Sequence, residues 1–315
     1  MDKVEILKRV GDISQICNAL QRRAISGKDD GNIYIDVFTG SGLVFSVVQN
    51  RALDISSASY KGKAISFISK NTVVSPYLFE EKNERFYRNF FGGLLTTCGM
   101  TYHGSSSYDD FHYYGTHGRY SNTPAEEVTI NKEWINDEYV ISIKGNIRDT
   151  KLFCENLLLK RTITTKLYSS SIEINDEAIN MGFTPCQLIM LYHINVGYPL
   201  LDKAAIFNKS LSDVIPRDEE AKKGINDYFR FSDPITGYKE QVFYHENFME
   251  DLIFGEVYNP LINTGLRIEF SRVQLPKLIQ WKMLASGDYA LGIEPSTNYP
   301  EGYISEKKCK QNHIS

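Results

Sequence analysis

The chain has 315 residues, a formal net charge of −4 and 42% hydrophobic residues, enough for a large buried core. A mildly acidic chain offers no basic face, which argues against nucleic acid and anionic membrane surfaces as partners. No stretch is apolar for long enough to cross a bilayer, and residues 1–10 lack the apolar segment of a signal peptide. The five cysteines are widely spaced and include no C-x-x-C pair, which excludes a disulfide framework and a zinc knuckle. We therefore expect a cytoplasmic protein.

Residues 1–30 are expected to form a helical extension ahead of the main fold. Asp12 and Gln15 have the spacing of a capping box. This pattern predicts one short helix that runs from Asp12 to about Arg23 and is ended by the glycine-flanked residues 27–31.

From residue 33 onward, apolar residues recur with a period of two, as in half-buried β-strands. Turn residues separate these segments, hardly a helix lies among them, and no repeat or linker divides them. The pattern predicts an all-β protein, a large antiparallel sandwich that forms one domain over residues 1–315. An exposed sheet face would also be compatible with a homodimer. The predicted strands include Ile33–Val37, Val44–Val48, Val140–Lys144, Ile172–Ile174, Ile253–Val257, Leu266–Phe270 and Leu278–Lys282.

Two regions lack this two-residue period of apolar residues. Phe90–Pro124 is rich in Gly, Tyr, Ser and His and is predicted to be a long irregular segment. Ser210–Asp233 is polar and charged, and we expect a surface excursion that contains a short helix. Long ordered loops in a compact fold are usually functional.

The segment Leu188–Asp202 reads as a strand that runs from the core into a cleft. Side chains two apart share a face of a strand, so His193 and Asn195 follow Ile189 and Leu191 on one side. A second predicted strand, near the C-terminus, places Glu294 at its polar end, on the same face as the small residues Ala290 and Gly292. A strand-end His and Glu can serve as acid and base for one substrate. The structural alternatives are a buried core histidine and a solvated strand-end glutamate.

Three histidines, His103, His112 and His117, fall in the first irregular region. Their spacing matches no helical pair of metal ligands and no Cys accompanies them, so a metal site is the less favoured interpretation. We expect His103 and His112 to lie at the loop surface. His117 precedes Gly118 and Arg119, which would allow close backbone approach to a ligand beside a fork of donors.

The remaining polar signals are weaker. Arg51 and Asp54 either pair to fix a turn or reach sugar hydroxyls, and Trp281 either lies in the core or stacks on a sugar ring. The sequence contains no G-x-S-x-G elbow, no phosphate-binding loop and no dinucleotide fingerprint.

Several motifs occur in an order that resembles the poorly characterised bacterial branch of the aldose 1-epimerase (galactose mutarotase-like) superfamily. The resemblance covers residues from about 30 to 303. The motifs are Arg51–Ile55, Gly92–Gly99, His117–Pro124, Leu191–Leu201, Gln241–His245, Gln280–Met283 and Gly292–Pro295.

The resemblance implies a β-supersandwich that binds a small-molecule sugar without metal or organic cofactor. It assigns the base to Glu294, the acid to His193 and hydroxyl binding to His117. The chain departs from the well-studied members at Tyr244, where they carry Asp. The other candidate substrate-binding residues are Arg51, Asp54, Arg119, Asn195, His245 and Trp281.

Mutarotation is thus the predicted activity, in which the sugar ring opens at C1 and closes on the other face. The alternatives are a sugar-binding or sensor protein that has lost catalysis and another sugar enzyme, such as an isomerase, lyase or hydrolase. A phosphorylated substrate is a further possibility because Arg85, Arg88 and Arg119 lie near the cleft in sequence.

Overall fold

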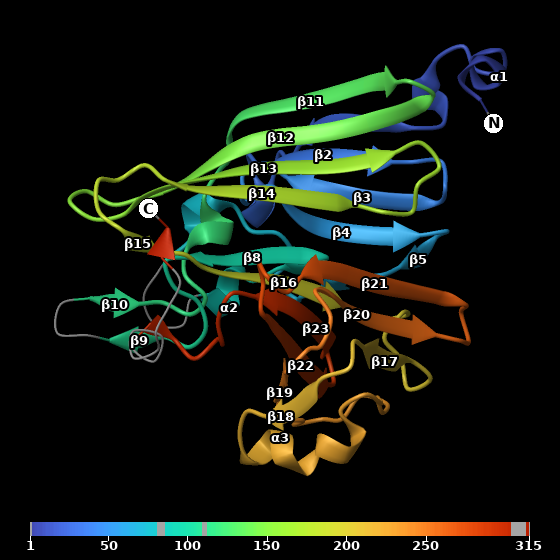
Figure 1. Cartoon of the computed structure of the whole chain (residues 1–315). Helices are drawn as coiled ribbons and strands as arrows, with labels where there is room; N and C mark the ends of the chain where they lie inside the picture. Colours follow the sequence, from blue (N-terminus) through green and yellow to red (C-terminus); the bar gives the residue numbers. More distant parts are fainter. Residues whose placement is uncertain (1, 81–85, 109–111, 304–312, 315) are drawn as a thin grey trace.

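The computed structural model describes residues 2–80, 86–108, 112–303 and 313–314, and these fold mainly into antiparallel β-sheet (Figure 1). The largest sheet of this part has 11 strands in the order β1-β2-β3-β4-β8-β16-β23-β22-β19-β18, with β5 paired to β4. Its strands are β1 (Asn18–Arg23), β2 (Ile33–Phe38), β3 (Leu43–Val48), β4 (Asp54–Tyr60), β5 (Lys63–Ala64), β8 (Leu95–Met100), β16 (Ile189–Val196), β18 (Asp213–Pro216), β19 (Gln241–Glu246), β22 (Lys277–Ala285) and β23 (Asp288–Ser296).

Smaller sheets and short helices complete the described structure. One sheet contains β11 (Glu126–Ile135), β12 (Glu138–Thr150), β13 (Asn156–Lys166) and β14 (Glu173–Asn180), and another contains β17 (Ile206–Lys209), β20 (Leu252–Asn259) and β21 (Thr264–Ser271). Paired short strands are β6 (Phe67–Ile68) with β7 (Gly92–Gly93), β9 (Ser107–Tyr108) with β10 (Tyr113–Tyr114), and β15 (Cys186–Gln187) with β24 (His313–Ile314). The helices are α1 (Lys3–Leu7), α2 (Phe86–Asn89) and α3 (Glu219–Lys223), with 3₁₀ turns η1 (Ile13–Gln15), η2 (Gly27–Asp29), η3 (Pro76–Leu78), η4 (Tyr120–Asn122) and η5 (Ile225–Asp227).

The core lies between the large sheet and the two smaller sheets. Figure 1 shows β11–β14 over β2–β4, and β20–β21 beside β22 and β23. One hydrophobic cluster joins the three sheets through buried residues such as Phe45, Ile143, Ile253 and Ile293. This arrangement confirms the predicted antiparallel sandwich, because strands with alternating apolar residues bury one face against another sheet.

Buried charge links the four-stranded sheet to the centre of the large sheet. The Arg161 guanidinium, on β13, lies 3.0 Å from the Asp54 carboxylate and 2.7 Å from the Asp176 carboxylate. It also donates to the Thr97 hydroxyl on β8 at 2.9 Å, and the Tyr192 hydroxyl on β16 donates to Asp176 at 2.8 Å. The side chains of Arg161 and Asp54 are fully buried and that of Asp176 is 5% exposed, and ionised side chains are tolerated in a core when they are paired in this way.

Two predictions about local structure are wrong. Asp12 caps only the short turn η1, where its carboxylate accepts from the Ser14 amide at 2.8 Å, and residues 18–23 form β1 instead of a helix. Pairing of β1 with β2 and burial of Ala19 outweigh the local helix preference of this segment. The region Phe90–Pro124 is not irregular throughout, because Leu95–Met100 forms the central strand β8, with all six residues buried.

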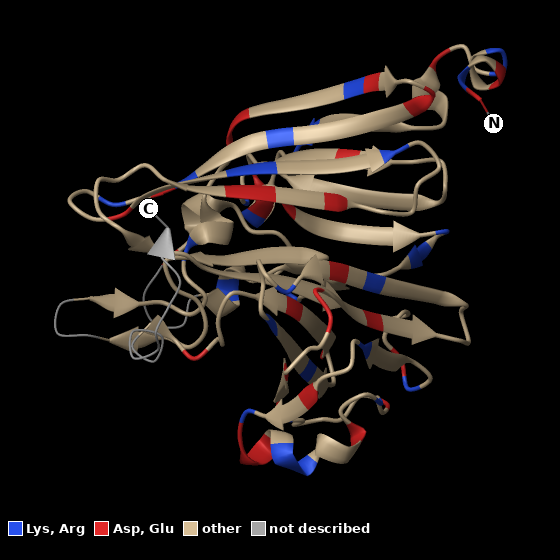
Figure 2. Ribbon diagram, in the orientation of Figure 1, with Lys and Arg blue, Asp and Glu red and all other residues tan. Residues whose placement is uncertain are grey.

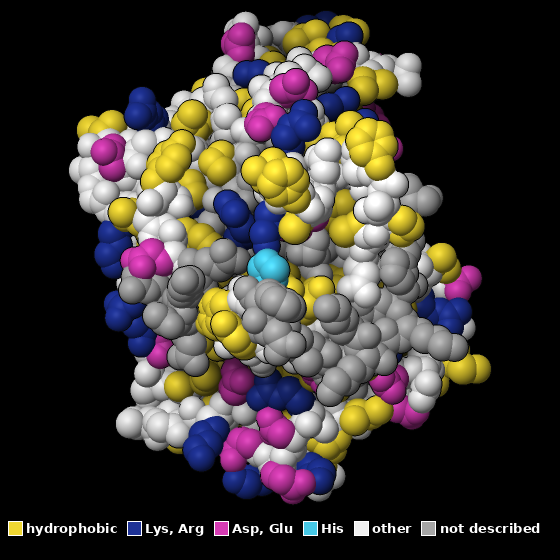
Figure 3. Space-filling model, turned by 90° about the vertical axis from the view of Figure 1, so that its left-hand side faces the viewer, with side chains coloured by type: hydrophobic (Ala, Val, Ile, Leu, Met, Phe, Trp, Pro, Cys, Tyr) yellow, Lys and Arg dark blue, Asp and Glu magenta, His cyan; other side chains and the backbone are white. Residues whose placement is uncertain are grey.

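The charged excursion contains the expected helix. Asp218 caps α3 by accepting from the Ala221 amide at 2.9 Å. Acidic and basic residues are both frequent along the ribbon of this segment in Figure 2, and side chains of both signs lie at the lower end of the face in Figure 3. In the described part of the chain, no helix is both long and apolar enough to cross a membrane.

The charge network predicts that replacing Arg161 by a neutral residue reduces the unfolding free energy more than replacing Arg148 does. Arg161→Met removes the ion-pair partner of the Asp54 and Asp176 side chains, so we expect a loss of about 3–5 kcal/mol in unfolding free energy. Arg148→Met, on the adjacent strand β12, breaks an exposed pair with Glu126 and should cost about 0–1 kcal/mol. Urea denaturation monitored by circular dichroism measures both, and equal losses would contradict the account.

Candidate active site

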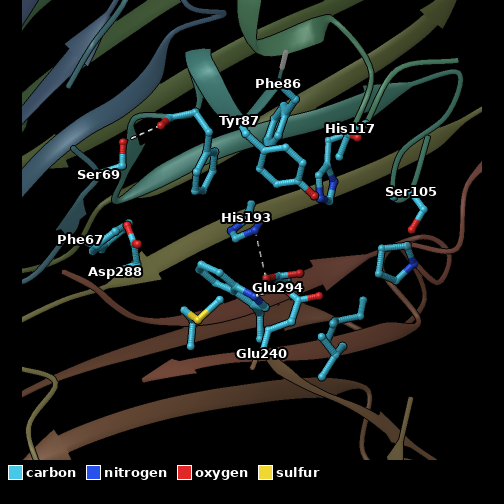
Figure 4. A pocket seen from close by; sticks show the side chains of 18 of the residues that line it. Phe67, Ser69, Phe86, Tyr87, Ser105, His117, His193, Glu240, Asp288 and Glu294 are labelled. Carbon is cyan, nitrogen blue, oxygen red and sulfur yellow. Dashed lines mark hydrogen bonds and ion pairs between the residues drawn. The ribbon is translucent and has the colours of Figure 1, made fainter. Parts of the chain in front are cut away.

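His193 and Glu294 face each other across two neighbouring central strands. β16 and β23 are antiparallel, and the register that pairs Ile194 with Ile293 sets His193 opposite Glu294. Directly opposed residues share a face of the sheet. The His193 Nε2 atom lies 3.3 Å from Glu294 Oε1 (Figure 4), and both side chains are almost completely buried. Two residues about a hundred positions apart therefore form one cross-strand pair.

Room for the Glu294 carboxylate comes from Gly292 on the same face of β23. A methyl group built on Gly292 would lie 2.2 Å from Glu294 Oε1, so the carboxylate occupies the space that a side chain would fill. The other neighbour on this face, Ala290, is also small and buried. The absence of a side chain at Gly292 allows the carboxylate to fold back over its own strand.

Burial shifts the proton affinities of the two groups in opposite directions. Burial raises the pKa of Glu294 well above its usual value, and the negative charge of Glu240 adds to the shift. Burial lowers the pKa of His193 to about 3, with a further contribution from His117. Burial therefore favours the uncharged form of each group, the neutral imidazole of His193 and the protonated carboxyl of Glu294.

The pair lies in a cavity of about 390 Å³, within the range of small-molecule sites. Rings surround His193: the centroids of Phe90, Trp281 and His117 lie 5.1, 5.5 and 5.7 Å from its own. Phe86 packs on His117 at 4.9 Å. Figure 4 shows Phe86, Tyr87 and His117 across the cavity from Glu294 and Glu240. The cavity therefore has aromatic side chains beside His193 and His117, and its lining also contains polar and charged groups such as Glu240 and Glu294.

His117 reaches the cavity from a tight turn. Its φ is +57°, and the following Gly118 passes so close to the carbonyls of Gly99 and Tyr102 that a methyl group would lie 2.8 and 2.9 Å from them. A glycine at position 118 therefore allows this turn to pack closely against the backbone at Gly99 and Tyr102. Burial lowers the pKa of His117 to about 4, so this imidazole is neutral at physiological pH.

Ion pairs lie at the cavity wall. Lys70 contacts Asp288 at 2.7 Å, and Arg217 contacts Glu240 at 3.0 Å. Trp281 Nε1 donates to the second oxygen of Glu240 at 2.8 Å. Glu240, Phe90 and Phe86 also line the cavity but were not among the predicted site residues, because their only signal in the sequence is proximity to motifs that supply other groups.

Several predicted substrate-binding residues do not line the cavity. Arg51 is fully buried and donates to the carbonyls of Val74 and Asn89 at 2.8 and 3.2 Å and to that of Ser121. It thereby ties together the loops that carry Phe86, Phe90 and His117. Asp54 belongs to the Arg161 network described above.

Three other candidates are also placed away from the cavity lining. Asn195 Nδ2, on the same strand as His193, donates to the Gly92 carbonyl at 3.1 Å and to the His193 carbonyl at 2.8 Å. His245 is buried against Gln280, with 3.2 Å between Nε2 and Oε1. Arg119 is exposed. Arg88 is likewise exposed and does not line the cavity, and Arg85 lies outside the described residues.

His103 is buried, contrary to the surface position predicted for it, and its Nε2 lies 3.1 Å from the Ser296 hydroxyl. His112 is exposed as expected. Within the residues that the structure describes, no three His, Cys, Asp or Glu side chains are arranged to hold a metal ion.

Comparison with known proteins identifies the family and the fold. The family model "Domain of unknown function (DUF4432)" matches residues 29–314. A candidate aldose 1-epimerase from Klebsiella pneumoniae is 24% identical, with a TM-score of 0.88, over 100% of this chain and 83% of that one. A galactose mutarotase-like protein from Clostridium acetobutylicum is 14% identical, with a TM-score of 0.64, over 95% of this chain and 92% of that one.

A more distant structure is galactose 1-epimerase from Lactobacillus acidophilus, which is 11% identical, with a TM-score of 0.52, over 89% of this chain and 90% of that one. No curated protein matches the sequence. At these identities the structural matches establish the fold alone. The chain belongs to the DUF4432 family, and its fold is that of the galactose mutarotase-like (aldose 1-epimerase) superfamily.

Proposed function

We propose that this protein interconverts the anomers of an aldose by general acid–base catalysis. The observation that carries the proposal is the 3.3 Å contact between His193 and Glu294 at the buried end of a cavity with aromatic walls. Ring opening requires removal of the proton on the C1 hydroxyl and delivery of a proton to the ring oxygen. A buried pair that holds one proton can do both without solvent.

In the proposed cycle Glu294 is the base and His193 the acid. The free site favours a neutral pair with the proton on Glu294, and transfer of that proton along the contact produces the carboxylate and imidazolium. Both forms contain one proton and differ only in which atom carries it. The carboxylate then takes the C1 hydroxyl proton while the imidazolium protonates the ring oxygen, and ring closure reverses both transfers.

His117 and Trp281 are the proposed sugar contacts among the predicted residues. His117 is neutral and faces the cavity across from Glu294, so it can donate or accept one hydrogen bond with a sugar hydroxyl. The Trp281 ring offers an apolar surface for a sugar face.

Removing either member of the pair should abolish most of the catalysis. We expect Glu294→Gln and His193→Asn each to reduce the anomer-exchange rate by about 10²–10⁴-fold. The double variant should be little worse than either single one, because the two groups act together. Magnetisation-transfer NMR between the anomeric signals measures the rate.

His245→Asn provides a matched control, because His245 is a buried histidine in the same sheet that does not line the cavity. It should retain the wild-type rate. Circular dichroism and urea denaturation should show Glu294→Gln as folded and at least as stable as the wild type, since it removes a buried ionisable group. Near-normal exchange by Glu294→Gln would refute the catalytic assignment.

Gly292→Ala tests whether the position of the carboxylate matters. The added methyl group must displace Glu294 Oε1, and a misplacement of about 1 Å can reduce a rate by about 10²-fold. Gly11→Ala, where nothing lies within 4 Å of the added methyl group, is the control. Unchanged kinetics of Gly292→Ala would show that the observed carboxylate position is not required.

The pH dependence of activity should reflect a pair with crossed pKa values, in which the proposed acid, His193, has a lower pKa than the proposed base, Glu294. Activity rises with pH as His193 loses its proton near its lowered pKa of about 3, because a doubly protonated pair has no base. Activity falls through the raised pKa of Glu294, because a fully deprotonated pair has no acid. After subtraction of the buffer rate, the acidic limb of kcat/KM should be centred near pH 3, below the ordinary pKa values of both Glu and His (about 4.3 and 6.5). An acidic limb centred at about pH 4.3 or higher would contradict the crossed order.

A further inference from the structure

The charged excursion contributes a basic group to the cavity wall. Arg217 lies between two carboxylates: its Nε donates to Asp218 at 2.9 Å and its Nη2 to Glu240 at 3.0 Å. Asp218 is itself fixed as the cap of α3. Arg217 is therefore held in place at the wall.

Glu240 is oriented from two sides. One carboxylate oxygen accepts from Arg217, and the other accepts from Trp281 Nε1 at 2.8 Å. All three side chains line the cavity that contains His193 and Glu294. The Glu240 charge also raises the pKa values of both Glu294 and His117, as expected of a carboxylate that faces the same chamber.

The remaining capacity of Glu240 defines what it can bind. An ionised carboxylate only accepts hydrogen bonds, and each oxygen has two lone-pair positions. The described contacts use one position on each oxygen, and the side chain is 43% exposed. Two acceptor positions are therefore open to a ligand that brings hydrogen-bond donors without negative charge.

We propose that Glu240 is a substrate-recognition residue that accepts hydrogen bonds from free hydroxyl groups on the sugar edge remote from C1. The substrate is accordingly an uncharged aldose and not a sugar phosphate. The direction of the sugar rests on the proposed function, which places C1 at His193 and Glu294.

The charges at the wall support the choice of an uncharged substrate. The two cationic side chains among the described lining residues, Lys70 and Arg217, are already paired with Asp288 and Glu240. A phosphate in this cavity would meet two carboxylates whose counter-ions are engaged. Such like-charge contacts are strongly unfavourable and serve to reject wrong ligands.

Binding measurements test the proposal independently of catalysis. NMR titrations would determine Kd for D-glucose, D-galactose and their 6-phosphates with the wild type, Glu240→Gln and Glu246→Gln. Glu246 is the matched control, because it pairs with Lys277 at 3.4 Å on β19 and does not line the cavity. We expect Glu240→Gln to raise Kd for the best-bound free sugar by about 10–100-fold, as for lost hydrogen bonds to a charged group. Glu246→Gln should bind like the wild type.

Kinetics separate recognition from a general structural role. Glu240→Gln should raise KM with little change in kcat, and it should move the alkaline limb of the pH profile to lower pH, because the charge that raises the Glu294 pKa is gone. A wild type that binds sugars without accelerating anomer exchange would refute the proposed function and leave the role of Glu240 intact.

Three outcomes would overturn the recognition proposal. The first is equal affinity of Glu240→Gln and Glu246→Gln for the best-bound sugar. The second is tighter binding of a 6-phosphate than of its parent sugar by the wild type. The third is the absence of wild-type binding to every sugar in the panel.

Discussion

The buried guanidinium of Arg161 is the contact that positions the candidate site within the fold. It connects strands of the four-stranded sheet with β4 and β8 of the large sheet through Asp54, Asp176 and Thr97. Thr97 is the register partner of Tyr192, whose hydroxyl joins the same network. The next residue along β16 is His193. Because successive side chains of a strand point to opposite faces, a network that fixes Tyr192 on the core side also fixes His193 on the cavity side.

Burial favours the uncharged forms of both groups in the site. It raises the pKa of Glu294 and lowers that of His193, so both side chains resist ionisation in the free protein. Such an arrangement costs folding free energy but suits a reaction that moves one proton in and one proton out. Arg51 makes a parallel contribution, because its contacts with the carbonyls of Val74 and Asn89 hold the loops that close over the pair.

Much of the sandwich was predictable because alternation of apolar residues directly reflects a strand with one buried face. The prediction failed where that reasoning does not apply. Leu95–Met100 is buried on both faces, so its sequence has no alternation to detect. The residues of β1 favour a helix locally, and only their pairing with a distant strand overrides this preference.

The site was predictable only in part, for a related reason. The proposed pair, His193 and Glu294, stands out because each is a polar residue at the end of an apolar strand. Glu240 and Phe90 are not marked by any such sequence pattern. They line the cavity because segments far apart in the sequence pack together. Burial of His103 likewise depends on a contact with Ser296 that no local pattern reveals.

Magnetisation-transfer NMR on the wild-type protein, with a panel of aldoses in dilute buffer, would show whether the protein catalyses mutarotation. We expect at least one uncharged aldose to exchange its anomers faster in proportion to protein concentration. If no aldose exchanges faster, although the same sugars perturb the protein's chemical shifts, the His193–Glu294 pair is not a mutarotation catalyst and the protein is a sugar-binding member of the fold.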